Sequence, residues 1–406
     1  MSTRQKLFWV AVLYFAEGFP FGIVVKVIPT YLRLQEISLA DIGFLSLARL
    51  PWTLKLLWAP AVDLWGSRRT WIWVSQALIG VSLLGFAAMH PANLVWMVGA
   101  LLVILAIFAA TQDIAIDAYT IQLMEKRELG PANGVRVTAY RLALIGSGGI
   151  LIAAADFFGW TAAFIGAALV LAGISVVSSR APTLVSAGAR EGVIPPPSLQ
   201  EAILTPLRLF LQRPGFLGVA VFVLTFKLGD MALGPMVEPF WVDRHFSLSE
   251  IALIPGTFGV VATIAGALLG GGLTSRWGIF RALWVLGIFQ AVSNLVYAAA
   301  AALPPSTPLM YAASFIESFC GGLGTAPFLA FLMSICSKAH AATQYALLSA
   351  LFGLTGALSG TFSGVVTEEF GYAAYFTATF FLAWPAFLLL PWVKTWAGDE
   401  RESQGR

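Results

Sequence analysis

Between two long apolar stretches the chain reads Gly271-Gly272-Leu273-Thr274-Ser275-Arg276-Trp277-Gly278. The corresponding place in the first half of the chain reads Ala59-Pro60-Ala61-Val62-Asp63-Leu64-Trp65-Gly66-Ser67-Arg68-Arg69. Both loops contain glycine, which permits a tight turn, and basic residues near a helix end. Two such loops, each between apolar stretches, indicate a membrane protein in which one arrangement of helices occurs twice.

The composition excludes most classes of soluble protein. The chain has 406 residues, of which 58% are hydrophobic and only 11% are charged, and its mean hydropathy is +0.82. A soluble globular domain carries about 25% charged residues, and disordered or nucleic-acid-binding chains are also rich in charge. We therefore expect a protein that lies in a lipid bilayer, without a nucleic-acid partner.

Twelve apolar stretches are long enough to cross the roughly 30 Å hydrocarbon core of a bilayer. They lie near residues 7–30, 41–63, 71–90, 93–117, 133–155, 160–179, 215–238, 249–272, 282–302, 308–335, 341–365 and 372–393. We predict an all-α membrane protein with twelve transmembrane helices in two pseudo-symmetric halves. The predicted domains are an N-terminal six-helix bundle (1–180), a cytoplasmic linker (181–213), a C-terminal six-helix bundle (214–395) and a cytoplasmic tail (396–406).

The Lys and Arg residues are unevenly distributed between the two sides of this arrangement. Sixteen of the 24 lie in the termini and in the loops after even-numbered spans, whereas only Arg33 and Arg244 lie on the opposite side. Because Lys and Arg concentrate in cytoplasmic loops, we expect both termini to lie in the cytoplasm. Glu17 interrupts the first apolar run and no small-residue cleavage site follows, which favours an uncleaved first span.

The two halves also match each other in sequence. The offsets between matching segments differ by only two residues, between 209 and 211, and the order of the segments is kept. The matches are Ser38–Ile42 with Ser247–Ile251, Pro29 with Pro239, and Gly146–Gly149 with Ala357–Gly360. Two parallel six-span repeats are a known transporter plan, with the substrate near the bilayer midplane.

The loop at residues 271–278 resembles the G-x-L-x-D-R-x-G signature of the major facilitator superfamily, with Ser275 in place of the family's Asp. The first-half loop keeps Asp63, Gly66 and the basic end, but lacks the first Gly and the central Arg. A charge at a helix end can pair across the halves and hold one state of a gate. We therefore assign Asp63 and Arg276 to gating, beside the plainer interpretation of ordinary cytoplasmic turns.

Four segments of the first half look like the AmpG-type permeases, a branch that also contains acetyl-CoA transporters. They are Glu17–Gly22, Ile42–Leu47 followed by Lys55–Pro60, Thr111–Tyr119, and Tyr140–Leu142 followed by Ser147–Gly149. The resemblance implies a proton-driven importer of muropeptides in the bacterial inner membrane. The long members of that branch look like fourteen-span proteins, and shorter relatives serve siderophore uptake. The cargo therefore stays open between an anionic sugar-peptide and a siderophore or another small solute.

Ionisable residues inside the spans are costly and usually mark substrate or proton paths. Asp113 and Asp117 are four residues apart, so both carboxylates lie on one face of a helix. Distances along the chain from the nearest turns place Asp117 level with Arg141, and Glu17 level with Lys55. We predict these two pairs, with Asp113 as the freer carboxylate.

The second half adds Lys227 and Asp230, which are three residues apart and can pair, and Glu317, which has no cation nearby in sequence. Glu17, Asp113 and Glu317 are then the candidates for proton coupling. The alternative interpretation is that the buried ion pairs only fix helix packing or the state of a gate.

Arginines inside the spans suit an anionic substrate, because a guanidinium binds a carboxylate through two hydrogen bonds. The candidates for substrate binding are Arg49 and Arg136, together with Gln112 and Tyr140 from the segments that resemble the permeases. Arg136 lies nearest the cytoplasmic end and also fits a gate. Gly266 and Gly270 are four residues apart, and we predict that they let two helices approach closely.

Other functions have less support in the sequence. Two Cys and three His show no metal-binding spacing, so we expect no metal, cofactor or disulfide. A multispan membrane enzyme needs a catalytic His cluster that these three residues do not provide. A pore is disfavoured by two repeated but inequivalent halves. We therefore expect a monomeric transporter that moves its solute by alternating access.

Overall fold

A computed structural model gives the structure of this protein and describes residues 1–64, 66–89, 95–125, 128–183, 208, 211–213, 215–336 and 341–404. Every regular element in these residues is a helix. Most of the predicted linker, 181–213, lies outside the described residues. So do five of the basic residues assigned to the cytoplasmic side, namely Lys126, Arg127, Arg190, Lys338 and Arg406.

The chain forms two compact units. The first contains Met1–Glu191 and Glu238–Val260, and the second contains Gly192–Val237 and Val261–Arg406. The short segment Glu238–Val260 therefore belongs with the first unit, although the repeat places it in the second half of the sequence.

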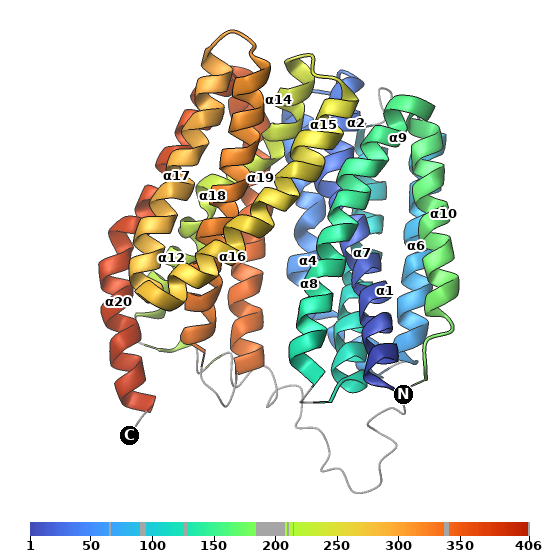
Figure 1. Ribbon diagram of the computed structural model, residues 1–406, viewed down its shortest axis with the longest axis horizontal. Helices are drawn as coiled ribbons and strands as arrows, with labels where there is room; N and C mark the ends of the chain where they lie inside the picture. Colours follow the sequence, from blue (N-terminus) through green and yellow to red (C-terminus); the bar gives the residue numbers. More distant parts are fainter. Residues whose placement is uncertain are drawn as a thin grey trace, which may run out of the picture. The chain divides into compact units, whose positions relative to one another are not determined.

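The first unit contains the helices of residues 3–178 and those of the segment Glu238–Val260 (Figure 1). The helices of residues 3–178 are α1 (Thr3–Gly22), η1 (Ile23–Val27), α2 (Ile28–Leu34), α3 (Leu39–Phe44), η2 (Leu45–Arg49), α4 (Leu50–Leu54), η3 (Lys55–Leu57), α5 (Ala59–Leu64), α6 (Arg68–Ala88), α7 (Val95–Leu123), α8 (Leu129–Ile145), η6 (Gly146–Ile150), α9 (Leu151–Phe158) and α10 (Trp160–Ser178). Helix α1 packs against α8 and α7, and α6 packs against α7 and α10. Apolar side chains of α1, α7 and α8, including Tyr14, Ile116 and Ala139, form one core of this unit.

The second half of the chain continues with α12 (Phe216–Phe226), α13 (Leu228–Leu233), η9 (Gly234–Met236), α14 (Val237–Asp243), α15 (Leu248–Leu253), η10 (Ile254–Phe258), α16 (Gly259–Trp277), α17 (Ile279–Ala302), α18 (Thr307–Ser334), α19 (Ala341–Leu382) and α20 (Trp384–Gln404). In the second unit α17 packs against α18 and α19, and α12 packs against α20. Phenylalanine is the commonest residue of its core, where the rings of Phe226 and Phe328 stack with centroids 5.2 Å apart.

By length and apolar content, nine helices of the described residues can cross a membrane, or ten with the bent pair Phe216–Phe226 and Leu228–Asp243. One of the nine, Leu347–Lys394, contains two spans, because the backbone leaves the helical conformation at Gly371 (φ 80°, ψ 162°). The second span, residues 39–64, is divided into short α and 3₁₀ pieces, so it escapes a test for long helices. The ten spans become twelve when Leu347–Lys394 is counted as two and the divided second span is added. All twelve predicted spans are therefore present.

The backbone repeats in the same way as the sequence. Glu36 and His245 have positive φ values of 59° and 61°, and their numbers differ by 245 − 36 = 209. Gly159 and Gly371 have φ values of 81° and 80° and differ by 371 − 159 = 212. These offsets are close to those found in the sequence, and the turns after spans 1 and 7, and after spans 5 and 11, share positive φ values at equivalent residues.

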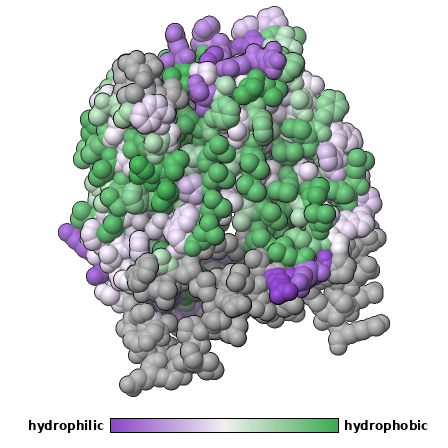
Figure 2. Space-filling model, turned by 180° about the vertical axis from the view of Figure 1, so that it is seen from behind, coloured by the Kyte–Doolittle hydropathy of each residue, from purple (hydrophilic) through white to green (hydrophobic). Residues whose placement is uncertain are grey.

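The surface agrees with a protein that crosses a bilayer. On the face seen in Figure 2, apolar side chains cover the middle of the molecule and hydrophilic ones gather toward two opposite ends. Many large apolar side chains are open to the surroundings, for example Leu217, Leu268 and Leu388. A lipid environment accounts for such exposure, because contact between large apolar side chains and water is unfavourable.

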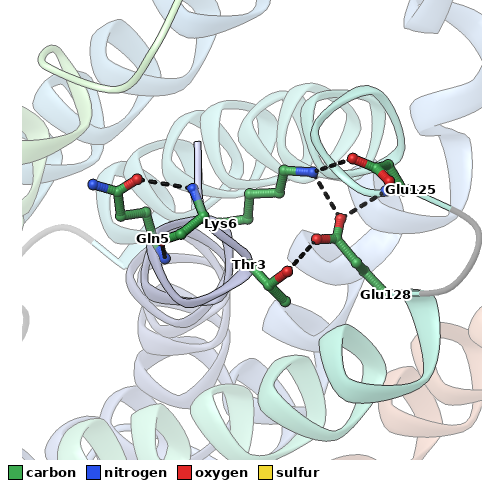
Figure 3. A network of polar contacts seen from close by, with 6 residues as sticks. Thr3, Gln5, Lys6, Glu125 and Glu128 are labelled. Atoms are coloured by element: carbon green, nitrogen blue, oxygen red, sulfur yellow. Dashed lines mark hydrogen bonds and ion pairs between the residues drawn. The ribbon is translucent and has the colours of Figure 1, made fainter.

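The start of α1 is tied to the turn between α7 and α8 (Figure 3). The Lys6 ammonium lies 2.8 Å from Glu128 and 3.1 Å from Glu125, and the Thr3 hydroxyl donates to Glu128 at 2.6 Å. The hydrogen bonds from Lys6 and Thr3 lower the pKa of Glu128 from 4.5 to about 2. Glu128 therefore remains ionised at physiological pH and holds the end of α1 in place.

Candidate functional site

A cluster of charged side chains lies where α1, α7, α8 and the broken second span meet. Helix α1 contributes Glu17, α7 contributes Asp113 and Asp117, η3 contributes Lys55 and α8 contributes Arg136. Helices α1 and α8 approach closely at Gly18, where an added Cβ atom would lie 2.8 Å from the carbonyl oxygen of Tyr140. Glycine at this position therefore allows two charge-bearing helices to approach each other.

Lys55 forms its ion pair with Asp113 and not with Glu17, the partner expected from the sequence, although Glu17 lies close enough to interact with the Lys55 charge. The Lys55 Nζ atom lies 3.0 Å from Asp113 Oδ2. The prediction assumed a regular helix through the second span, whereas the chain forms a 3₁₀ turn at Lys55–Leu57. That change of helix type redirects the Lys55 side chain toward α7, so Asp113 is not the freer carboxylate.

Asp117 pairs with Arg136, and the predicted pairing with Arg141 is also wrong. Arg136 Nη2 lies 3.4 Å from Asp117 Oδ1, and the Tyr14 hydroxyl donates to the same oxygen at 2.7 Å. Level depth in the bilayer does not fix the direction of a side chain. Positions 136 and 141 are five residues apart, which turns their side chains about 140° from each other around an α-helix.

Glu17 is the carboxylate of this cluster that carries no ion pair among the described residues. Its side chain is buried, with 7% exposure, and its Oε2 atom has no hydrogen-bond partner in the part of the chain that the structure describes. The cluster contains three carboxylates and two cations, so it has one negative charge in excess when all are ionised. Buried carboxylates close to one another favour binding of a proton.

Gln112 and Tyr14 link the cluster to α1. Gln112 is fully buried and its side-chain amide donates to the Ala16 carbonyl at 2.8 Å, which places it between α1 and α7. The guanidinium of Arg136 lies 4.6 Å from the centroid of the Tyr14 ring. Sequence reasoning missed Tyr14, although its position three residues before Glu17 places it on the same face of α1.

The other candidates for substrate binding lie beside aromatic rings. The Arg49 guanidinium lies 5.8 Å from the Phe21 ring centroid, and the Phe21 and Tyr140 rings lie 6.3 Å apart. Tyr140 and Arg141 are both half-buried on α8. Arg49 and Tyr140 therefore belong to one aromatic group next to the charged cluster.

The second unit has a polar cluster of its own. The predicted pair of Lys227 and Asp230 is confirmed, with 2.7 Å between Nζ and Oδ2. Lys227 is 2% exposed and also donates to Gln290 at 2.9 Å and to the Gly321 carbonyl at 3.2 Å. Lys227 ends α12 with non-helical angles (φ −102°, ψ 6°), so the span bends at the charge. Gln290 was missed, because an uncharged residue in an apolar span gives a weak signal.

Glu317 lies close to this second cluster. A Cβ atom placed on Gly321 would lie 3.2 Å from Asp230 Oδ1 and 3.8 Å from Glu317 Oε1. The two carboxylate oxygens are therefore at most 3.2 + 3.8 = 7.0 Å apart.

The contacts of the two loops at residues 59–69 and 271–278 give less information about function. Arg276 is exposed in the last turn of α16, and the Ser275 hydroxyl bonds its own helix at Gly271. The side chain of Asp63 lies outside the described residues. Arg68 donates to the Ala118 carbonyl at 3.2 Å, which joins this loop to α7. The gating roles of Asp63 and Arg276 stay predictions.

Comparison with known proteins assigns the family. The family model of the Major Facilitator Superfamily matches residues 7–303 and 224–404, which together cover nearly the whole chain. This chain belongs to the Major Facilitator Superfamily. The predicted all-helical, twelve-span fold is confirmed by its likeness to solved structures. A bacterial homologue of the human lysosomal transporter Spinster has a TM-score of 0.80 at 16% identity and covers 98% of both chains. A D-xylose–proton symporter has a TM-score of 0.74 at 14% identity, with 96% of this chain and 97% of that chain covered.

Sequence relatives place this superfamily member in the AmpG branch. It is 32% identical over 388 residues to the anhydromuropeptide permease of Escherichia coli (strain K12). The aligned region covers 93% of this chain and 78% of that protein. It is 28% identical to the putative transporter AmpG 4 of Rickettsia conorii, with 96% of this chain and 97% of that protein covered. The chain is therefore a multi-pass membrane transporter for a small molecule rather than an enzyme.

Proposed function

We propose that this transporter imports an anhydromuropeptide-like anionic solute across the bacterial inner membrane, driven by protons. The observation that carries the proposal is the cluster in the first unit, where three carboxylates face two cations. Glu17 is the member that binds and releases the coupling proton. Both termini lie in the cytoplasm in this proposal, and the transporter works as a monomer without a cofactor.

The cargo assignment rests on the name of the 32% identical relative and on the arginines of the first unit. Arg49 and Arg136 supply the positive charge that a peptide carboxylate needs, and the aromatic rings of Phe21 and Tyr140 suit the faces of sugar rings. Gln112 supports the cluster from its buried position. Tyr140 contributes a half-buried ring beside Arg49.

The other predicted residues have supporting roles in this proposal. Asp113 shares the coupling proton with Glu17, because Lys55 neutralises only one carboxylate of the pair. Lys227 and Asp230 stabilise the bend in the seventh span, and Glu317 is a further protonation site in the second unit. Asp63 and Arg276 belong to the cytoplasmic gate, and Arg141 lines the path beside Tyr140.

An uptake panel tests the cargo. Purified transporter in proteoliposomes is given a labelled anhydromuropeptide, a ferric siderophore and a neutral disaccharide, each with and without an inward proton gradient. The expected result is gradient-dependent uptake of the anhydromuropeptide alone. Uptake of the siderophore in its place would assign the protein to the other cargo class, and no gradient dependence for any solute would refute proton coupling.

A further inference from the structure

We propose that Arg136 is shared between Asp117 and the solute, so that arrival of an anionic solute leaves Asp117 free to take up a proton. This inference rests on the proposed function and adds a residue-level link between solute binding and proton binding. It assigns to Arg136 a coupling role, in addition to the substrate contact expected from the sequence.

The first support is the geometry of the ion pair. The distance from Arg136 Nη2 to Asp117 Oδ1 is 3.4 Å, whereas Lys55 Nζ lies 3.0 Å from Asp113 Oδ2. A guanidinium has five N–H donors and makes its strongest contact with a carboxylate through two of them. The observed 3.4 Å contact is longer than a strong charge-assisted hydrogen bond, so Arg136 has donors to offer to a second anion.

The second support is exposure. The Arg136 side chain is 44% exposed and Asp117 is 35% exposed, whereas Lys55 and Asp113 are 28% and 12% exposed. A charged head group exposed within a span is unfavourable against lipid and is found facing protein or water. Of the two cations in the cluster, Arg136 is the one that a solute anion reaches more easily.

The third support is the environment that remains when Arg136 turns to the solute. Tyr14 keeps its hydrogen bond to Asp117 Oδ1 at 2.7 Å, and its ring holds the guanidinium at 4.6 Å by a cation–π contact. Arg136 can thus change partner with a small movement. A proton from the aqueous phase then adds to Asp117 Oδ2, and no covalent bond within the protein changes.

The charge count gives the direction of the effect. The groups that face Arg136 or Asp117 are Tyr14 and Glu17 on α1, Lys55 on η3 and Asp113 on α7. With Arg136 engaged by Asp117, the cluster has one excess negative charge. When a solute carboxylate takes over Arg136, the excess among the protein's own groups rises to two, which favours binding of a second proton.

A ligand-free measurement tests the charge exchange itself. Infrared spectra report protonated carboxyl groups by their C=O stretch, and Arg136→Gln imitates an arginine withdrawn from Asp117. We expect one additional protonated carboxyl near neutral pH in Arg136→Gln, and its loss in the double variant Arg136→Gln/Asp117→Asn. Arg141→Gln, a matched change on the same helix, is expected to leave the wild-type signal. A wild-type spectrum for Arg136→Gln would overturn the inference.

A second measurement follows protons during solute binding. Purified transporter in weakly buffered detergent solution is mixed with an anhydromuropeptide or with the same compound after amidation of its carboxylates. The wild type is expected to take up about one proton per anionic probe bound and none with the amidated probe, and Arg136→Gln none with either. Equal proton uptake by Arg136→Gln and wild type would contradict the proposal. If the wild type does not bind the probe, the cargo assignment fails, while the infrared result still decides the role of Arg136.

Discussion

At the scale of single residues, the charged side chains of the first unit form two ion pairs, Lys55 with Asp113 and Arg136 with Asp117. Glu17, Lys55, Asp113, Asp117 and Arg136 stand out because charges are rare inside apolar spans. Their partners depend on the direction of each side chain around its helix, which distance from a turn does not give. The same is true of Tyr14. Its part in the cluster is evident only from the structure, in which its hydroxyl group donates to Asp117.

The pair of Lys55 and Asp113 provides the first residue-scale prediction. Lys55→Gln and Asp113→Asn each leave a mostly buried charge without its partner, which costs on the order of 3 kcal/mol. The double variant removes both charges and is expected to be more stable than either single variant. Thermal unfolding of the purified transporter in detergent measures this coupling, and strictly additive losses would argue against the pair.

Glu128 provides a prediction of pH dependence. Its pKa is lowered from 4.5 to about 2 in the folded protein, so its bonds to Lys6 and Thr3 contribute stability above pH 4.5. That contribution is lost as the pH falls from 4.5 toward 2. Glu128→Gln should lower the unfolding temperature at pH 7, and the difference from wild type should shrink below pH 4.5. A difference that stays constant down to pH 3 would show that the ionised form is not responsible.

At the scale of helices, apolar length predicted where the spans lie but not where they break. The interruptions at Leu45–Arg49, Gly146–Ile150 and Ile254–Phe258 lie next to prolines and glycines. Prolines and glycines indicate where a helix can be interrupted, but they do not predict whether the backbone forms a π turn, a 3₁₀ turn or a bend. The predicted close packing at Gly266 and Gly270 is confirmed, since an added Cβ atom at either would meet the α18 backbone at Phe319 or Leu323.

A pair of glycine variants tests this helix contact. Gly266→Ala should destabilise the second unit by about 1–3 kcal/mol, because α16 and α18 must move apart to admit the methyl group. Gly271→Ala is the matched control on the same helix, since nothing lies within 4 Å of its Cβ position. Chemical unfolding curves of the two variants should differ clearly, and equal stability would mean that the helices are not in close contact at Gly266.

At the scale of the whole molecule, the repeat was predictable from the sequence. The contacts that join residues of one repeat to residues of the other were not. The first unit includes the segment Glu238–Val260 of the second half. Arg33 binds Asp243 through two hydrogen bonds of 2.5 and 2.8 Å, and Lys26 lies 3.1 Å from Glu238. Arg33 and Asp243 differ by 243 − 33 = 210 residues, so they occupy equivalent places in the two repeats. Contacts at such separation leave no local pattern in the sequence.

These contacts predict that transport requires the segment Glu238–Val260 to move relative to α2. In a variant without Cys320 and Cys336, cysteines placed at positions 33 and 243 are joined by a short reducible thiol cross-linker. Cross-linking should abolish solute uptake, and reduction should restore the level measured before cross-linking. Each single-cysteine variant treated with the same reagent is the control. Undiminished uptake by the cross-linked protein would show that this contact does not open during transport.

The measurement that tests the proton-coupling claim most directly compares wild type with Glu17→Gln in proteoliposomes. With one proton per solute, an inward gradient of one pH unit sustains about tenfold accumulation of an anhydromuropeptide. We expect the wild type to reach that level, and Glu17→Gln to lose accumulation while still exchanging labelled for unlabelled solute. Gradient-driven accumulation by Glu17→Gln at the wild-type level would contradict the assignment of the coupling proton to Glu17.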